Sequence, residues 1–227
     1  MKTVVITGSS SGIGEALVSL FHKEGYKVAA IDIKKPRLEI RGVEYYIADV
    51  SKPSEIKDVT KNFGHIDLLI NNAAVQYVSK LVESKDEHNL EMILTNTYGP
   101  LVVTKYFSPL LKGGLIINVG SVHSRLPREE KIPYDMSKAA LNIFTKETAL
   151  ELSEQNTRAI CVEFGAVDTP MNEFSNETEK KEAISKQVIP HLMSSEECAN
   201  FIYSLTKDEF KYLNGETIRY DSGRHLK

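Results

Sequence analysis

Two residues in the stretch YDMSK, Tyr134 and Lys138, have the types and the spacing for proton transfer. Residues four apart share one face of a helix, so the phenol and the ammonium can point the same way. A free tyrosine has a pKa near ~10, and a nearby cation favours the phenolate and lowers that value. We therefore expect Tyr134 to have a lowered pKa and to act as an acid or base near neutral pH.

The residues around this pair predict that it lies on a helix. Apolar side chains recur there at helical spacing, at Met136, Ala140, Ile143 and Phe144. A tyrosine and a lysine at this spacing often form only a surface contact, which is the alternative interpretation. The place of the helix, after an apolar run that ends in NVGS (118–121), favours a chemical role.

A second chemical feature is the stretch TGSSSGIG, residues 7–14, which precedes the first helical pattern. A helix N-terminus presents unpaired N–H groups that attract a pyrophosphate, and glycine lets phosphate oxygens approach the backbone. The spacing of Gly8, Gly12 and Gly14 is GxxxGxG, which is neither GxGxxG nor a P-loop. The stretch predicts a dinucleotide site, and a glycine-rich turn without a ligand is the alternative.

Asp32 supports the dinucleotide interpretation. It closes the second apolar run, 18 residues after Gly14. A carboxylate there can accept hydrogen bonds from both hydroxyls of the adenosine ribose, and it would repel a 2′-phosphate. We therefore expect NAD to be preferred over NADP, although the basic pair Lys34–Lys35 just beyond can weaken the discrimination.

An alternation of strands and helices must position these residues. Several apolar runs do not alternate with polar residues, which is typical of strands buried on both faces of a parallel sheet. The runs are TVVIT (3–7), KVAAID (27–32), EYYIA (44–48), DLLIN (67–71), LIINVG (115–120), AICVEF (159–164) and ETIRY (216–220). Helical patterns lie between them, and we expect the first helix to stop at Gly25. The pattern predicts an α/β fold with helices on both faces of the sheet.

Length and composition fit a single domain over residues 1–227, with 41% hydrophobic and 26% charged residues. The net charge of -3 gives no electrostatic argument for a nucleic acid or membrane partner. We expect no signal peptide and no membrane span, and the cytoplasm is the default location. The two cysteines, Cys161 and Cys198, lack CxxC spacing, so we expect neither a disulfide framework nor a metal site.

One segment, 170–192, differs from the rest because it contains the highly charged run NEFSNETEKKEAISKQ (172–187). It is either a solvated surface segment or a mobile lid over a site.

The chain resembles the short-chain dehydrogenase/reductase superfamily in its compact single-domain form, over nearly its full length. Motifs occur in the expected order: TGSSSGIG (7–14), Asp32, DV (49–50), NNAA (71–74), Asn96, GS (120–121), YDMSK (134–138) and GAVDT (165–169). The resemblance implies a Rossmann-like, doubly wound parallel sheet of about seven strands in the order 3-2-1-4-5-6-7. It also implies hydride transfer between a nicotinamide cofactor, NAD(P), and an alcohol or carbonyl substrate.

The resemblance assigns four catalytic residues. Tyr134 would be the general acid/base, and Lys138 would bind the nicotinamide ribose and tune the phenol. Ser121, 13 residues before Tyr134, would orient the substrate oxygen. Asn96 would complete a proton relay through a water near Lys138.

The resemblance also implies a set of cofactor contacts. Asp49 would bind the adenine amino group, Asn72 and Ala73 would line the cofactor, and Thr169 would hold its carboxamide. The full set of expected cofactor-binding residues is Gly8, Ser10, Ser11, Gly12, Ile13, Gly14, Asp32, Asp49, Val50, Asn72, Ala73, Ala74, Tyr134, Lys138, Gly165, Val167 and Thr169.

Each of these residues also has a purely structural interpretation. Asn96 can be a helix kink or cap residue, and Ser121 and Ser124 can end a strand by bonding to their own backbone. Asn71 and Asn72 can be turn residues, and so can Thr169 before Pro170.

The sequence departs from the family pattern at two places. The family usually has Asn-Asn-Ala-Gly after the fourth strand, whereas the last residue here is Ala74, which is strained if the position needs a positive φ. The usual Pro-Gly before the nicotinamide loop is Phe164–Gly165, which adds an aromatic side chain near the pocket.

Candidate residues for the substrate pocket are Gln76, His123, Arg125 and Met171. The polar members favour a hydroxylated or anionic substrate over a bulky sterol. A surface or structural role for His123 is the alternative.

Two other functions stay open. One is a related lyase or epimerase with tightly held NAD, which would usually have a larger C-terminal domain. The other is a dinucleotide-binding regulator without turnover, which would usually have lost the tyrosine or the lysine. Because relatives commonly pair helices and tails, we expect a homodimer or homotetramer.

Overall fold

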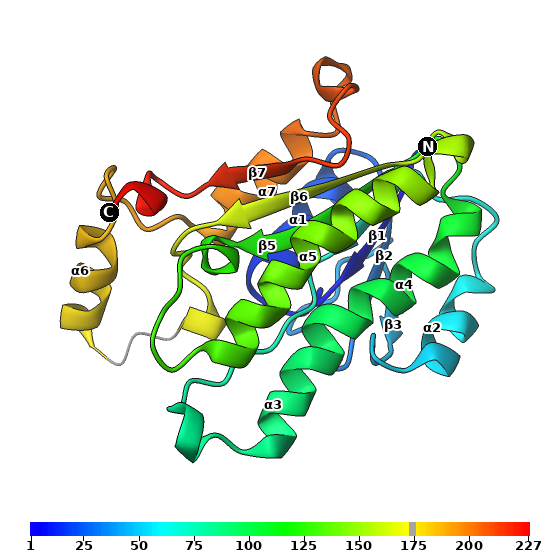
Figure 1. The fold of residues 1–227 in the computed structure, drawn as a ribbon. Helices are drawn as coiled ribbons and strands as arrows, with labels where there is room; N and C mark the ends of the chain where they lie inside the picture. Colours follow the sequence, from blue (N-terminus) through cyan, green and yellow to red (C-terminus); the bar gives the residue numbers. More distant parts are fainter. Residues whose placement is uncertain (173–175) are drawn as a thin grey trace.

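The computed structural model describes residues 1–172 and 176–227. Seven strands form one sheet, in the order β3-β2-β1-β4-β5-β6-β7, and all neighbouring pairs are parallel (Figure 1). The strands are β1 (Thr3–Thr7), β2 (Lys27–Asp32), β3 (Glu44–Ile47), β4 (Leu68–Asn71), β5 (Leu115–Ser121), β6 (Arg158–Phe164) and β7 (Thr217–Tyr220). Every strand predicted from an apolar run is confirmed, with ends that differ by at most one residue. The doubly wound topology is confirmed as well.

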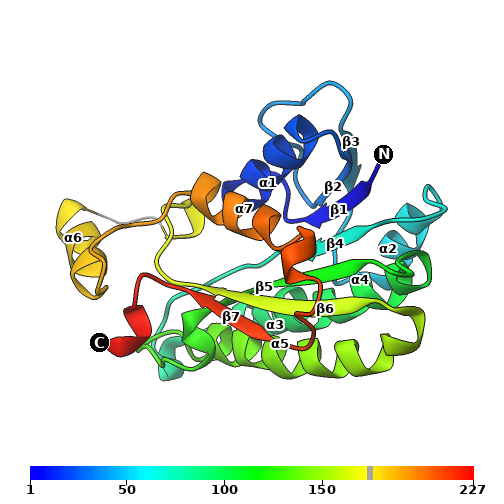
Figure 2. The same cartoon turned by 90° about the horizontal axis from the view of Figure 1, so that it is seen from above.

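Helices cover both faces of the sheet. They are α1 (Gly12–Lys23), α2 (Pro53–Thr60), α3 (Asp86–Ile93), α4 (Gly99–Phe107), α5 (Ile132–Glu151), α6 (Glu177–Ser185) and α7 (Ser195–Ser204). A π-helical turn, Leu94–Tyr98, joins α3 to α4. In Figure 2, α1 and α7 lie on one face of the sheet, and α2, α4 and α5 lie on the other. The pair Tyr134 and Lys138 lies on a helix, α5, as predicted, and this helix packs against β5 and β6.

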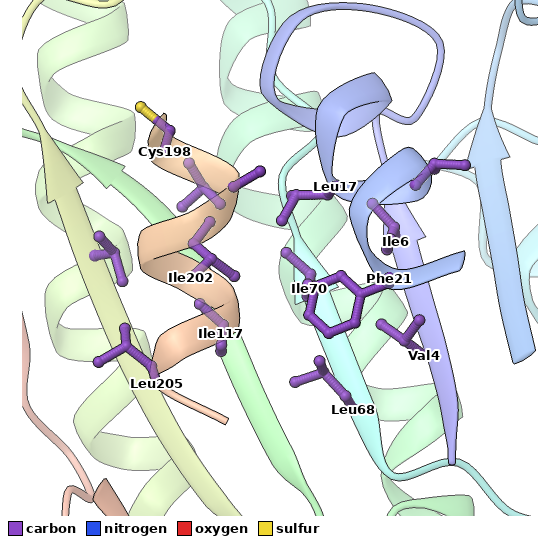
Figure 3. Packing of buried hydrophobic residues seen from close by; sticks show 14 of the residues in the cluster. Val4, Ile6, Leu17, Phe21, Leu68, Ile70, Ile117, Cys198, Ile202 and Leu205 are labelled. Carbon is purple, nitrogen blue, oxygen red and sulfur yellow. The ribbon is translucent and has the colours of Figure 1, made fainter. Parts of the chain in front are cut away.

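The core on the α1 and α7 face shows why these segments fold as they do. Phe21 and Leu17 of α1 pack against strand residues such as Ile70, and Ile202 of α7 packs beside them (Figure 3). All four side chains are fully buried. Helix α1 ends at Lys23, and Gly25 follows with a φ of +80°, so the predicted glycine stop is confirmed.

The second core, on the α2, α4 and α5 face, holds side chains such as Val5, Ile56 and Phe107. The strands thus bury apolar side chains on both faces, which explains their continuous apolar runs. No helix in the described part of the chain is long and apolar enough to cross a membrane.

Candidate active site

A cavity of about 1270 Å³ lies at the carboxyl ends of the strands. Residues at or just after the ends of five different strands line it, among them Gly8, Asp32, Asn72, Ser121 and Gly165. Ligands of doubly wound sheets bind at this edge, near the point where the strand order reverses, which is between β1 and β4 here. The volume exceeds that of an ordinary small-ligand pocket and suits a long ligand.

The turn between β1 and α1 brings the backbone close to this cavity. Gly8 has a φ of +65° and Gly12 a φ of +55°, a region that L side chains rarely adopt. A Cβ at Gly8 would lie 2.6 Å from the Cα atom of Ala73. Ser11 is the N-cap residue, but its side chain does not cap the helix, so the first turn of α1 keeps N–H groups for an anion.

Gly14 has a different role from the other two glycines, because it does not line the cavity. A Cβ there would lie 1.9 Å from the carbonyl oxygen of Gly8, so this glycine lets α1 pack against its own preceding turn. The structure thus places Gly14 in the support of the predicted site rather than in its wall.

Thr7 joins the ends of β1 and β4, and the sequence analysis missed it. Its Oγ1 accepts hydrogen bonds from the backbone N–H groups of Asn72 (3.0 Å) and Ala73 (3.1 Å). The Asn72 amide donates in return to the carbonyl oxygens of Thr7 and Gly8, both at 3.0 Å. Asn72 is therefore more than a turn residue, since it fixes the glycine turn against β4. The only indication of this role in the sequence was the position of Thr7 at the end of the first apolar run.

Asp32 lies at the end of β2 and accepts two backbone hydrogen bonds. Its carboxylate accepts from the N–H groups of Ser10 (3.0 Å) and Lys34 (2.8 Å). Lys34, Lys35 and Arg37 line the same end of the cavity, so cations surround the expected ribose position more fully than the sequence indicated. Asp49 also lines the cavity, and its side chain accepts from the N–H and hydroxyl of Ser51 at 2.9 and 2.7 Å.

Tyr134, Lys138 and Ser121 meet at the cavity and are all buried. The Lys138 Nζ atom donates to the carbonyl oxygen of Val119 (2.9 Å) and lies 5.7 Å from the centre of the Tyr134 ring. The Ser121 hydroxyl caps the turn after β5 by accepting from the N–H of His123 (3.2 Å). Three of the four residues predicted to carry the chemistry therefore line one cavity.

The expected lowering of the Tyr134 pKa is wrong for the protein alone. Burial of the phenol raises its pKa to about 12, and a hydrogen bond with Ser121 offsets this only in part. Lys138 does not reverse the shift, because its ammonium donates to Val119 and is itself buried. Burial lowers the pKa of Lys138 to about 8.

Asn96 lies in the π-helical turn and is almost completely buried. Its side-chain oxygen accepts from the N–H of Val75 (2.8 Å), and its amide donates to the carbonyl of Val75 (2.9 Å) and to Ser137 (3.1 Å). Asn96 thus fixes the segment after β4 against α5. Asn96 is not among the residues that line the cavity, so its part in a proton relay stays a prediction.

Buried polar side chains form hydrogen bonds that connect the ends of β4 and β5 with α4 and α5. The Asn71 amide donates to Asn118 (2.9 Å) and Thr104 (3.1 Å), and the Asn118 amide donates to Thr145 of α5 (2.9 Å). Asn71 is consequently a sheet residue that connects β4 with α4 and β5, and not a turn residue.

Most of the remaining expected cofactor residues line the cavity, including Ser10, Ile13, Val50, Ala73, Ala74, Val167 and Thr169. Ala74 does not have a positive φ, so the methyl group that departs from the family pattern causes no left-handed strain. Phe164 also lines the cavity, while its ring packs edge-on against Phe201 and Tyr220.

Three of the four candidate substrate residues line the cavity: Gln76, His123 and Met171. Arg125 does not, because its guanidinium lies 3.5 Å from the buried carboxylate of Glu163. The His123 Nδ1 atom lies 2.9 Å from the carbonyl oxygen of Leu126, so Nδ1 carries the proton. Burial lowers the pKa of His123 to about 4, which keeps the ring neutral at physiological pH.

Lys131 is a cavity residue that the sequence analysis missed. It is 4% exposed and its Nζ atom donates to the Oε1 atom of Gln76 (2.8 Å). Burial lowers its pKa to about 8. A lysine beside a helix start has no distinctive spacing, so only the fold could reveal that its side chain turns inward.

Helix α6 of the predicted lid segment forms one wall of the cavity through Glu179, Glu182 and Ala183, and Lys186 just after the helix also lines it. Figure 1 places this helix next to the C-terminus, and Lys227 donates to the carbonyls of Ser185 (3.1 Å) and Gln187 (2.9 Å). Residues 173–175 of the expected lid 170–192 lie outside the described residues. The segment thus borders the site, and its motion stays a prediction.

The described residues contain no cluster of three or more His, Cys, Asp or Glu that could hold a metal ion. Cys161 and Cys198 are free thiols, and both are buried.

Comparisons with known proteins agree with this fold. A family model for short chain dehydrogenases matches residues 2–180. A 3-oxoacyl-(acyl-carrier-protein) reductase from Thermotoga maritima is 34% identical, covering 98% of this chain and 97% of the relative. A glucose 1-dehydrogenase from Gluconobacter oxydans is 30% identical, covering 99% and 92%. The structure of 4-hydroxyisoleucine dehydrogenase complexed with NADH superposes with a TM-score of 0.93 at 24% identity, covering both chains fully.

Proposed function

The chain belongs to the short-chain dehydrogenase family, and on that basis we propose that it is an NAD-dependent oxidoreductase acting on an alcohol or carbonyl substrate. One observation carries the proposal: Tyr134, Lys138 and Ser121 line the same cavity. The glycine turn at Gly8 lines that cavity as well. A proton-transfer group and an anion-binding helix start thus share one continuous cavity, as hydride transfer with a dinucleotide requires.

The cavity fits a dinucleotide on local grounds. Gly8 and Gly12 both have left-handed φ values, and a Cβ at Gly8 would collide with the Ala73 backbone. The first turn of α1 offers N–H groups to a pyrophosphate. Asp32 would hold the adenosine ribose hydroxyls, and Asp49 and Val50 would contact the adenine. Asn72, Ala73 and Ala74 would line the middle, and Gly165, Val167 and Thr169 the nicotinamide end. When bound, the nicotinamide ring supplies or accepts the hydride.

Tyr134 holds the proton that the substrate oxygen gains or loses. In the reduction direction, the phenol with its pKa of about 12 is already protonated and can donate to the carbonyl oxygen. In the oxidation direction, the phenol must first lose its proton, so the complex with ligands has to lower that pKa. Ser121 would orient the substrate oxygen, because its hydroxyl is held at the end of β5 by the His123 N–H.

Lys138 and Asn96 support this proton transfer from α5 and the π-helical turn. Lys138 would bind the nicotinamide ribose while its ammonium remains on the carbonyl of Val119. Asn96 keeps Val75 and Ser137 in place, so it would position the cavity wall and complete a proton relay through a water near Lys138.

Asp32 supports NAD as the preferred cofactor. Its carboxylate is fixed by two backbone N–H groups and would repel the negative charge of a 2′-phosphate. The cations of Lys34, Lys35 and Arg37 would instead attract a 2′-phosphate. We therefore propose a preference for NAD and not a strict exclusion of NADP.

An apolar face on α4 and α5 supports a homo-oligomer. Leu101 of α4 and Met136, Ile143 and Leu150 of α5 are 45%, 59%, 56% and 70% exposed. These residues include part of the apolar spacing that predicted the helix, and the monomer leaves them uncovered. A second copy of the chain would bury them.

The function is tested with purified protein and a panel of sugars, polyols, hydroxy acids, ketones and steroids, with NADH absorbance as the readout. Dinucleotide binding is measured separately by fluorescence. Turnover of at least one alcohol or carbonyl compound is expected. Dinucleotide binding without turnover of any panel member would favour a regulator instead.

A further inference from the structure

Lys131 places a buried positive charge in the wall of the cavity. Among the described residues its ammonium forms no ion pair, and the one hydrogen bond of Nζ goes to the neutral amide of Gln76. Its Nζ atom lies 5.7 Å from the centre of the Tyr134 ring, so the charge is next to the reacting group. Burying an ammonium is costly unless a negative group compensates it. Because the buried Lys131 ammonium costs stability and lies near the Tyr134 ring, we expect it to have a role in binding.

The backbone before Lys131 is held in an unusual conformation that sets the position of this residue. Glu130 has a φ of +66°, although it is not a glycine. Its carbonyl oxygen accepts a hydrogen bond from the N–H of Ser79 (2.9 Å). The same two segments are joined a second time by the contact of Lys131 with Gln76. The connection between residues 76–79 and 130–131 thus supports a strained turn, and strain of this kind is concentrated at functional sites.

Gln76 adds a second donor to the site. An ammonium can only donate, so the oxygen of the Gln76 amide must face Lys131, and the Nε2 atom points elsewhere with two N–H groups. Within the described chain, Nε2 has no acceptor. Lys131 and Gln76 together therefore present N–H donors and no free acceptor of their own, which suits a negatively charged oxygen.

The surroundings of Lys131 are also positive on balance. Arg128 and Arg224 line the cavity, and both act electrostatically on His123, as Lys131 does. Asp135 is the carboxylate that acts on Lys131, but it accepts a hydrogen bond from the N–H of Arg128 (3.2 Å). His123 is neutral and contributes no charge of either sign.

The cavity wall also contains the carboxylates of Asp32, Asp49, Glu87, Glu91, Glu179 and Glu182. Glu91 of α3 accepts from the Tyr77 hydroxyl (2.8 Å), and Glu182 of α6 pairs with Lys186. Neither forms an ion pair with Lys131.

We propose that Lys131 and Gln76 bind a carboxylate of the substrate, so that the preferred substrate is a small oxo or hydroxy acid. This inference rests on the proposed oxidoreductase function and adds the substrate class to it. One buried ammonium balances one negative charge, which fits a carboxylate better than a phosphate dianion. The carboxylate would lie against Lys131 while the carbonyl or hydroxyl oxygen of the same molecule contacts Tyr134 and Ser121.

The test compares oxo acids of three to six carbons with their uncharged amides and with phosphate esters of similar length. Activity is followed by NADH absorbance in the unchanged protein, in Lys131→Gln and in Lys80→Gln. Lys80 is exposed and lies outside the cavity wall, so it is a control for loss of one positive charge. Binding of NADH and the thermal transition are measured for each protein to show that it folds.

The unchanged protein should use at least one acid with a kcat/KM about tenfold or more above that of its amide. Lys131→Gln should raise KM for the acid by about tenfold to a hundredfold, the range for a hydrogen bond to a charged group, with little change in kcat or in KM for the amide. Lys80→Gln should leave all values unchanged.

Three results would overturn the inference while the proposed function stands. They are equal use of acids and amides, an equal loss for both in Lys131→Gln, and a preference for phosphate esters. If NADH binds but no carbonyl or hydroxyl compound in either panel is turned over, the proposed function fails and the inference fails with it.

Discussion

Tyr134 and Lys138 lie one helical turn apart on α5, with the ammonium 5.7 Å from the centre of the phenol ring and hydrogen-bonded to the carbonyl of Val119. The two groups are adjacent, yet the folded chain alone does not make the phenol more acidic, because both are buried. Burial opposes the charged form of each group, which raises the pKa of Tyr134 and lowers that of Lys138.

The first prediction concerns this phenol. Because burial raises the pKa of Tyr134 to about 12, the protein without cofactor should show no tyrosinate signal from this residue below about pH 10, the ordinary tyrosine value. The measurement is an ultraviolet titration of the unchanged protein minus that of Tyr134→Phe. Ionisation of Tyr134 near neutral pH in the free protein would contradict the dominance of burial.

The second prediction concerns cofactor choice. Asp32→Ser removes the carboxylate that would repel a 2′-phosphate, and Lys34, Lys35 and Arg37 remain to attract it. The ratio of kcat/KM for NADP over NAD should therefore rise by about tenfold or more, the effect of roughly one charged hydrogen bond. Asp58→Asn on α2, which is exposed and outside the cavity, is the control. An unchanged ratio in Asp32→Ser would show that this carboxylate does not select the cofactor.

The third prediction concerns the glycine turn. Gly8→Ala forces a left-handed φ on alanine, at a cost of about 1–2 kcal/mol, and places a methyl group against the Ala73 backbone. A loss of 1 kcal/mol lowers Tm by about 2–4 °C in a protein of this size, and dinucleotide affinity should fall as well. Gly64→Ala is the matched control, since a Cβ there meets no atom within 4 Å. Normal dinucleotide affinity in Gly8→Ala would argue against a ligand at this turn.

The fourth prediction concerns assembly. Ile143→Glu places a charge on the apolar face of α4 and α5, so the protein should shift to a smaller species in sizing chromatography with light scattering. Val82→Glu adds the same charge at a side chain that is 90% exposed and lies outside α4 and α5, and it should leave assembly unchanged. A monomer for the unchanged protein, or equal assembly of all three proteins, would refute an interface on this face.

The sequence predicted the strands well because burial on both faces of a parallel sheet leaves long apolar runs. It predicted which strand ends would meet, and hence that Gly8, Asp32 and Ser121 would share one site. Two kinds of feature escaped prediction. Thr7 and Asn118 act through hydrogen bonds between strands that are distant in the chain, and these depend on the register of the sheet.

Lys131 and Arg125 show the other limit. Both are basic residues near a helix start or a strand end, yet Lys131 turns into the cavity whereas Arg125 pairs with Glu163 outside it. The direction of a long side chain depends on the local backbone, here the left-handed Glu130, which no spacing pattern revealed. The predicted direction of the Tyr134 pKa shift was wrong for a related reason, because the sequence shows the neighbouring charge but not how deeply the phenol is buried.

The most direct test of the central claim measures turnover and NADH binding in Tyr134→Phe, with the best substrate from the panel. The phenyl ring keeps the packing but has no proton to exchange, so turnover should fall by at least about a hundredfold, the lower end of general acid–base catalysis, while NADH affinity stays within a few-fold. Turnover close to that of the unchanged protein would contradict proton transfer by Tyr134.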